Sequence, residues 1–149
     1  KNHMCVRVIG DKTGLAPDIQ ESIAKLEKES ANQDGLNFTI AINYGSRDEI
    51  RRAVQKIVKE GIRPEDITED VISDHLDTAG IPDPDLLIRT SGELRLSNYL
   101  MWQLAYTEFY FTDVPWPDFT KEELKKAIEK YNSRDRRYGG VKEEPKEES

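Results

Sequence analysis

The chain has 149 residues, of which 36% are hydrophobic and 34% are charged, and its formal net charge is −7 at pH 7. This length suits one domain with a core, and the negative charge argues against a general nucleic-acid-binding protein. The single cysteine, Cys5, excludes an internal disulfide framework and fits a reducing compartment. Because a reducing compartment is typical of the cytoplasm, we expect a cytoplasmic protein. No apolar run approaches the length of a membrane span.

In the first part of the chain, strand-like and helix-like patterns alternate. Residues 5–10 are a short apolar run that ends in a glycine, which predicts a buried strand. Residues 15–30 carry apolar side chains near one helical face, and Pro17 suits the first turn of a helix there. Residues 36–43 are rich in β-branched side chains and predict a second strand.

Two helices are expected next. Ser46 and Glu49 have the spacing of a capping box, which predicts a helix over residues 47–60. Thr68 is expected to cap a shorter helix that follows it. The arginines of the longer helix are expected to form a solvated face rather than a binding site: Arg47, Arg51 and Arg52.

The second half of the chain continues the alternation. We expect a strand at 86–89, a helix through 99–105, a strand at 108–111 and a helix at 121–132. Ser97 or Asn98 would cap the first of these two helices, and a capping box that begins at Thr120 would start the second.

This order predicts an α/β domain with a mostly parallel central sheet and helices on both faces. The domain is expected to occupy residues 1–140, and the charged residues 141–149 are expected to be a disordered tail. Because the chain begins close to a strand, we expect its N-terminus to be truncated.

A polar cluster at residues 89–98 is the strongest candidate for chemistry, because ligands of α/β proteins collect beyond the carboxyl ends of strands. Arg89 and Arg95 offer planar guanidinium groups that suit phosphate oxygens. Ser97 adds a hydroxyl at an expected helix start, where backbone N–H groups favour an anion. Gly92 would let the backbone approach a ligand. The pattern predicts a site for an anion the size of a diphosphate.

Structural interpretations of the same residues remain open. Glu93 and Asp85 could pair with the arginines in an ion-pair network that binds nothing. Ser97 could be a helix cap without a ligand. Asn43, in a second polar cluster, is expected to form a hydrogen bond within its own turn.

Three stretches of the sequence resemble the cis-prenyltransferases, in particular the bacterial undecaprenyl diphosphate synthases: AINYGSRDEI, DPDLLIRTSGELRLSNYLMWQLAYTEFYFTDVPWPDF and RDRRYGG. The likeness extends from about residue 6 to residue 140. Members of this family condense isopentenyl diphosphate with an allylic diphosphate, usually farnesyl diphosphate, and form cis double bonds. The resemblance implies synthesis of undecaprenyl or a similar polyprenyl diphosphate for the lipid carrier of cell-wall synthesis.

The resemblance also implies roles for particular residues. The diphosphate of isopentenyl diphosphate would be held by Arg89, Arg95, Ser97 and the backbone of Leu96. Glu108 would contribute to a Mg²⁺ site. A C-terminal segment would touch phosphate in the partner's active site of a homodimer, through Arg137, Tyr138 and Gly139. The lipid product would allow peripheral contact with a membrane.

Two departures from the family pattern affect these expectations. Leu94 stands where many relatives have a histidine near the metal. The family's N-terminal aspartate loop, which binds magnesium and the allylic diphosphate, has no counterpart in this sequence, so no catalytic residue and no product length can be assigned. The alternative is a catalytically silent dimer-partner subunit, or an inactive fragment that only binds isopentenyl diphosphate.

Overall fold

The computed structural model describes residues 3–134, and these residues form two units. The first unit comprises residues 3–84 and 95–106, and the second comprises residues 85–94 and 107–134.

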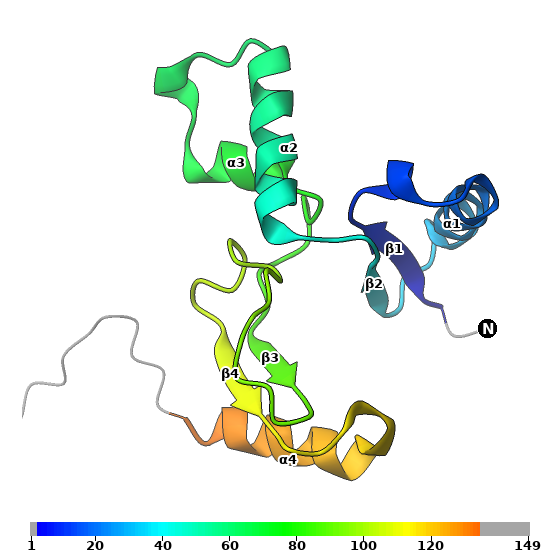
Figure 1. The fold of residues 1–149 in the computed structure, drawn as a ribbon, viewed down its shortest axis with the longest axis vertical. Coiled ribbons are helices and arrows are strands. Elements are labelled where there is room, and N and C mark those ends of the chain that lie inside the picture. The colour runs from blue at the N-terminus through cyan, green and yellow to red at the C-terminus, as the bar shows by residue number, and fades with distance from the viewer. Residues whose placement is uncertain (1–2, 135–149) are drawn as a thin grey trace, which may run out of the picture. The chain divides into compact units, whose positions relative to one another are not determined.

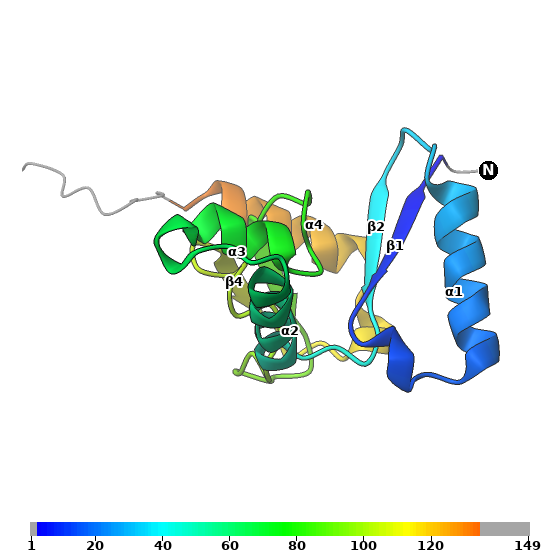
Figure 2. The ribbon, with the colours of Figure 1, turned by 90° about the horizontal axis from the view of Figure 1, so that it is seen from above.

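In the first unit, β1 (Cys5–Ile9) pairs in parallel with β2 (Asn37–Ala41), with Cys5 opposite Asn37. The helix α1 (Pro17–Ser30) connects them and packs on β1 (Figure 2). The other edge of β1 is satisfied by side chains of this helix, because the Val6 N–H donates to Ser30 Oγ at 3.0 Å and the Val8 N–H to Glu27 Oε1 at 2.8 Å. At this edge of β1, the N–H groups of Val6 and Val8 are therefore not available to pair with a further strand.

The helices α2 (Ser46–Lys59) and α3 (Glu69–His75) pack against each other in the same unit (Figure 1). Their apolar contribution to the core includes Ala53 and Ile57 of α2, which are buried. The Thr68 side chain accepts a hydrogen bond from the Val71 N–H at 3.2 Å, which confirms the expected cap of α3.

The expected capping box of α2 is wrong, although the helix itself is confirmed. Gly45 is the N-cap residue, and Ser46 already belongs to the helix. Both expected cap residues are buried and have distant partners instead. Ser46 Oγ accepts from the Met101 N–H at 3.0 Å, and Glu49 Oε1 accepts from the Asp77 N–H at 2.9 Å. Burial with long-range partners therefore replaced the local capping contacts that the spacing suggested.

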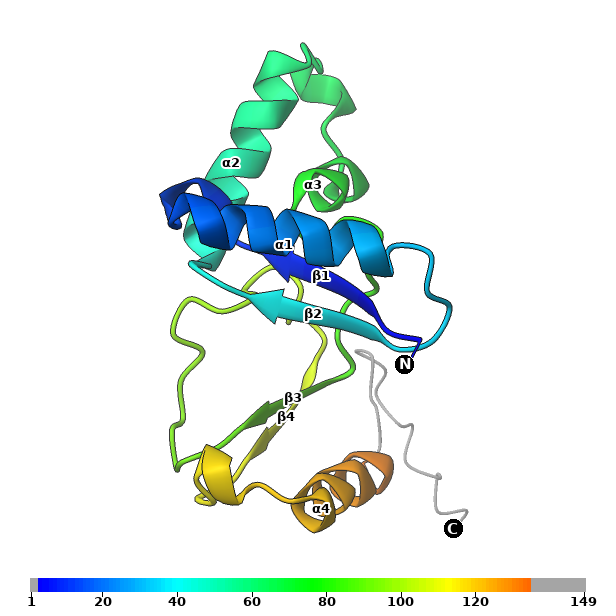
Figure 3. The same ribbon diagram turned by 90° about the vertical axis from the view of Figure 1, so that its right-hand side faces the viewer.

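In the second unit, β3 (Leu86–Arg89) pairs in parallel with β4 (Glu108–Phe111). The helix α4 (Lys121–Asn132) packs against β4 (Figure 3). Its buried residue is Ala127. Thr120 is the N-cap residue of α4, but its side chain makes no capping hydrogen bond, so the second capping box is also wrong.

The α/β class and the parallel pairing are confirmed. Among residues 3–134, however, the strands form two two-stranded sheets, β1–β2 and β3–β4, rather than one central sheet. The expected helix at 99–105 is also wrong, because residues 97–106 form turns. Positive φ angles at Ser97 (51°), Asn98 (62°) and Leu100 (43°) cannot continue a right-handed helix.

Candidate diphosphate-binding site

The residues that the sequence assigns to the anion site lie in both units. Arg95, Leu96 and Ser97 belong to the first unit, and Arg89 and Glu108 belong to the second. Residues 137–139, to which the resemblance assigns phosphate contacts, and the expected tail at 141–149 lie outside the described residues. The predictions for Arg137, Tyr138 and Gly139 therefore stay predictions.

In the first unit, Leu96 and Ser97 line a hollow of about 350 Å³ together with Arg47, Asn98 and Met101. Two segments that are far apart in the sequence form its walls, namely the first turn of α2 and the turns after residue 95. Ser97 and Arg95 are exposed, so a ligand could reach both from solvent. Arg47 was expected on a solvated face of its helix, but it lines this hollow, after the carboxyl end of β2.

Backbone N–H groups at the start of α2 have partners within the protein. The Ser46 N–H donates to the Asn98 carbonyl at 2.8 Å, and the Arg47 N–H donates to Asn98 Oδ1 at 2.9 Å. No helix begins at Ser97, which lies in a turn. The expected contribution of a helix start to anion binding is therefore wrong at Ser97, and the N–H groups of Ser46 and Arg47 are not available to an anion in this hollow.

Asn43 also differs from the expectation. Its Nδ2 donates to the Asp11 carbonyl at 2.8 Å rather than within its own turn, and its φ is +48°. This contact connects the loops that follow β1 and β2.

In the second unit, Arg89 ends β3, and its carbonyl accepts a hydrogen bond from the Thr112 N–H at 3.0 Å. No ion pair of the Arg89 guanidinium is found among residues 3–134, so the ion-pair-network interpretation has no support at this arginine. The turn after β3 is held by backbone contacts. The N–H groups of Ser91 and Gly92 donate to the carbonyls of Val114 and Thr112, both at 3.0 Å, so these two donors are already used.

Glu108 does not lie beside Arg89. In the β3–β4 register Glu108 is opposite Leu86, whereas Arg89 is opposite Phe111. Three residues of parallel strand separate the two positions by about 10 Å, and alternation places their side chains on opposite faces of the pair. The Glu108 carboxylate also accepts a hydrogen bond from Arg134.

A metal site of several protein ligands is not found in the described part of the chain. No group of three or more His, Cys, Asp or Glu side chains within residues 3–134 is arranged to hold a metal ion. Leu94, which replaces the histidine of many relatives, is 76% exposed. The described residues alone therefore do not make a complete Mg²⁺ site, and the prediction for Glu108 stays a prediction.

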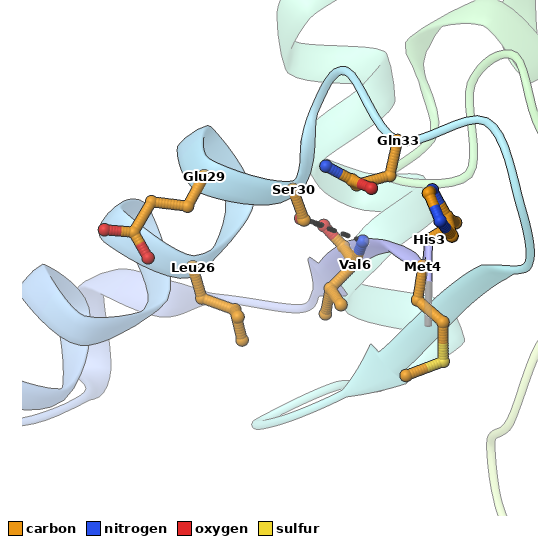
Figure 4. A pocket seen from close by; sticks show the side chains of 7 residues that line it. All are labelled: His3, Met4, Val6, Leu26, Glu29, Ser30 and Gln33. Atoms are coloured by element: carbon orange, nitrogen blue, oxygen red, sulfur yellow. Dashed lines mark hydrogen bonds between the residues drawn. The ribbon is translucent and has the colours of Figure 1, made fainter. Parts of the chain in front are cut away.

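A second hollow, of about 310 Å³, lies at the other end of the β1–β2 sheet (Figure 4). It is lined by His3, Met4, Val6, Leu26, Glu29, Ser30 and Gln33. The apolar side chains of Met4, Val6 and Leu26 extend toward the same side in this view. Because this hollow adjoins the start of β1 and the end of α1, it is not at the carboxyl ends of the strands, where ligands of α/β proteins collect.

No helix within residues 3–134 has the length and apolar character needed to span a membrane.

The sequence matches a protein family described as "Putative undecaprenyl diphosphate synthase" over residues 1–139. The isoprenyl transferase of Porphyromonas gingivalis is 51% identical over 147 residues, and that of Geobacillus kaustophilus is 54% identical over 140 residues. These alignments cover 96% and 91% of this chain but only 58% and 54% of the relatives. The chain thus spans little more than half the length of these curated relatives.

Solved structures of prenyl diphosphate synthases have a similar fold. Lavandulyl diphosphate synthase from Lavandula x intermedia, in complex with dimethylallyl diphosphate, matches with a TM-score of 0.87 and 42% identity over 92% of this chain and 61% of that protein. A probable undecaprenyl diphosphate synthase from Campylobacter jejuni matches with a TM-score of 0.84 and 34% identity over 93% of this chain and 64% of that protein.

Proposed function

We propose that this chain, which belongs to the undecaprenyl diphosphate synthase family, supplies the part of a cis-prenyltransferase that binds isopentenyl diphosphate. The observation that carries the proposal is the hollow lined by Leu96, Ser97 and Arg47. The first N–H groups of α2 are already bonded there, and the exposed hydroxyl of Ser97 remains as a donor, two residues after the exposed Arg95. Such donors suit the oxygens of a diphosphate.

The proposed reaction is an ionic prenyl transfer. The C–O bond of the allylic diphosphate breaks and diphosphate leaves, while the alkene of isopentenyl diphosphate forms a bond to the allylic carbon. A proton is then lost from the new chain. Arg89, Arg95 and Ser97 hold the diphosphate of the nucleophilic substrate, which is a proximity role. Cationic side chains also stabilise the negative charge on phosphate oxygens.

The finer features of the proposal are supported by the resemblance. Farnesyl diphosphate is the proposed allylic substrate, and the product is a cis-polyprenyl diphosphate such as undecaprenyl diphosphate. We also propose a cytoplasmic homodimer in which the segment with Arg137 and Gly139 serves the partner's site. Its lipid product would bring it into peripheral contact with a membrane.

Mg²⁺ belongs to the proposal as the ion that, when bound, offsets negative charge on a diphosphate. Glu108 is the residue that the resemblance assigns to it, and carboxylate oxygens suit this hard cation. Because Glu108 accepts from Arg134 and lies away from Arg89 on the strand pair, the described residues do not fit a complete site. The proposal therefore assigns no reaction step to the ion.

Calorimetric titration of the chain with isopentenyl diphosphate tests the proposal. We expect saturable binding that weakens at least about tenfold in the double variant Arg89→Gln/Arg95→Gln. Arg63→Gln is the matched control, because Arg63 is an exposed arginine that pairs with Asp66 at 2.8 Å. Equal binding by the double variant and the control would contradict the proposal. An assay of product formation from farnesyl diphosphate and isopentenyl diphosphate then distinguishes the two hypotheses: an active enzyme forms product, and a catalytically silent binding subunit does not.

A further inference from the structure

Asn98 connects the segment that carries Arg95 and Ser97 to the first turn of α2. Its carbonyl accepts from the Ser46 N–H at 2.8 Å, and its Oδ1 accepts from the Arg47 N–H at 2.9 Å. Its φ of 62° is a left-handed conformation, which asparagine adopts more readily than most residues. These two contacts hold the Arg47 backbone next to the residue that follows Ser97.

Two further features concern the junction between the Asn98 segment and the start of α2. Ser46, which is fully buried, accepts the Met101 N–H on its Oγ at 3.0 Å. A Cβ atom added to Gly45 would lie only 2.7 Å from Asn98 Nδ2, so a side chain at position 45 would displace the amide group of Asn98. Hydrogen bonds of Asn98 and Ser46 thus hold the backbone of Arg47 close to the segment that carries Ser97.

The arginines of α2 differ in their partners. Arg51 donates to Asp48 Oδ1 at 3.0 and 2.6 Å, and Arg52 donates to Asp48 Oδ2 at 2.8 Å. Hydrogen bonds from Arg52 and then Arg51 hold the pKa of the Asp48 carboxyl below its usual range. Asp48, the nearest carboxylate in sequence, is therefore engaged by other arginines. No ion pair of Arg47 is found among residues 3–134, and its side chain lines the hollow.

The exposed guanidinium of Arg47 shares a hollow with Leu96 and Ser97, and it has no carboxylate partner within residues 3–134. Such a group can offer two parallel N–H donors to a phosphate group. We infer that Arg47 is a further residue that binds the diphosphate of isopentenyl diphosphate, placed at the site by Asn98. The inference rests on the proposed function and adds a residue that the sequence had predicted to be a solvated face. The apolar side chain of Met101, in the same hollow, suits the hydrocarbon part of the substrate.

The test compares Arg47→Gln with Arg51→Gln, because both remove one guanidinium from the exposed part of the same helix. Calorimetry would measure the affinity of each variant for inorganic pyrophosphate and for isopentenyl diphosphate. We expect Arg47→Gln to weaken both affinities about tenfold, and Arg51→Gln to change them less than about twofold. Arg47→Lys keeps the charge without the planar fork and should recover part of the loss.

The outcomes separate this inference from the proposed function. If the unchanged chain binds isopentenyl diphosphate and Arg47→Gln binds it as tightly as Arg51→Gln, Arg47 is not part of the site, and the proposed function stands. If the unchanged chain binds neither compound, both fail. Circular dichroism melting of each variant checks folding. A loss of affinity in Arg47→Gln with an unchanged melting temperature, partly restored in Arg47→Lys, supports a direct contact.

Discussion

The Arg52 guanidinium donates hydrogen bonds to both carboxylate oxygens of Asp77, at 2.7 and 2.6 Å. Asp77 Oδ2 also accepts from the Gly10 N–H at 3.0 Å, so this carboxylate joins α2 to the end of β1. The two side chains are only 20% and 12% exposed. Burial opposes the ionisation of Asp77, but the hydrogen bonds and charge of Arg52 outweigh it and hold the pKa of this carboxyl below its usual range. The expectation that Arg52 lies on a solvated face of its helix is therefore wrong.

Asp77→Asn should destabilise the protein by about 3 kcal/mol, because it leaves the Arg52 charge partly buried without its partner. Urea unfolding measures the change in the free energy of unfolding. Arg51→Gln is the control, since Arg51 pairs with Asp48 at a more exposed site, and its loss should cost less than about 1 kcal/mol. Similar costs for the two variants would refute the prediction.

The Asp77 pair also predicts a pH dependence. A carboxyl whose pKa is lower in the folded chain stabilises it at pH values above its unfolded pKa, for which 3.8 is the ordinary value. This stabilisation is lost as the pH falls below that value and through the folded pKa. The difference in unfolding free energy between the natural chain and Asp77→Asn should therefore be constant near neutral pH and decrease in acid below about pH 4. A difference that grows in acid would contradict this sign.

Glu49 is 1% exposed, and its carboxylate accepts hydrogen bonds from several neighbours. Its donors are the Tyr44 hydroxyl, the Asp77 N–H and Gln103 Nε2, the last at 3.2 Å. Glu49→Gln would turn an amide N–H₂ group toward one of these donors, and we expect a loss of about 2 kcal/mol in the free energy of unfolding. Glu21→Gln, at an exposed position of α1, should be neutral within about 0.5 kcal/mol. Denaturant unfolding of the two variants with equal midpoints would count against this role of Glu49.

His75 should make the stability depend on pH near neutrality. Its Nδ1 lies 2.6 Å from the Val71 carbonyl and its Nε2 lies 3.0 Å from Glu60 Oε2, so both ring nitrogens face acceptors. The doubly protonated imidazolium satisfies both contacts. The hydrogen bond with Glu60, followed by that with Val71, raises the pKa of His75 above the ordinary value of 6.5, although burial and the nearby Lys56 oppose this.

A raised pKa stabilises the folded chain fully below the unfolded pKa, and the contribution disappears as the pH rises through the folded pKa. His75→Gln should therefore be less stable than the natural chain at about pH 5.5, with the difference vanishing at about pH 8.5. Urea unfolding at both pH values provides the measurement. Glu60→Gln should reduce the same pH dependence, because it removes the carboxylate that pairs with His75 at 3.0 Å. A stability difference that increases with pH would show that the sign is wrong.

Arg89→Ala in the intact enzyme should mainly raise the KM for isopentenyl diphosphate, by about tenfold, with a smaller effect on kcat. The physical reason is that Arg89 is proposed to position the nucleophilic substrate rather than to touch the reacting carbons. Steady-state kinetics at saturating farnesyl diphosphate measures both constants, with Arg63→Gln as the control arginine. An unchanged KM would remove Arg89 from the proposed site.

The bounds of most elements could be predicted from the sequence because they depend on local properties. Strands β3 and β4 and helix α4 begin and end where their apolar patterns predict. The errors at α2 and at residues 97–106 occurred where distant segments supply hydrogen bonds. Ser46 took a partner 55 residues away in Met101, and Asn98 joined a residue 51 positions away in Arg47 instead of capping a helix of its own. No local pattern contains these contacts.

The sequence by itself determined the α/β class, the parallel pairing of its strands and the cationic and hydroxyl groups of the loop at residues 89–98, because periodicity and side-chain chemistry are properties of neighbouring residues. Only the tertiary structure decided which of these groups share a hollow. It placed Arg47 beside Ser97, through Asn98, and it separated Glu108 from Arg89 along the strand pair. Strand register and long-range hydrogen bonds determine which of these residues are neighbours, because both depend on partners that are far apart in the chain.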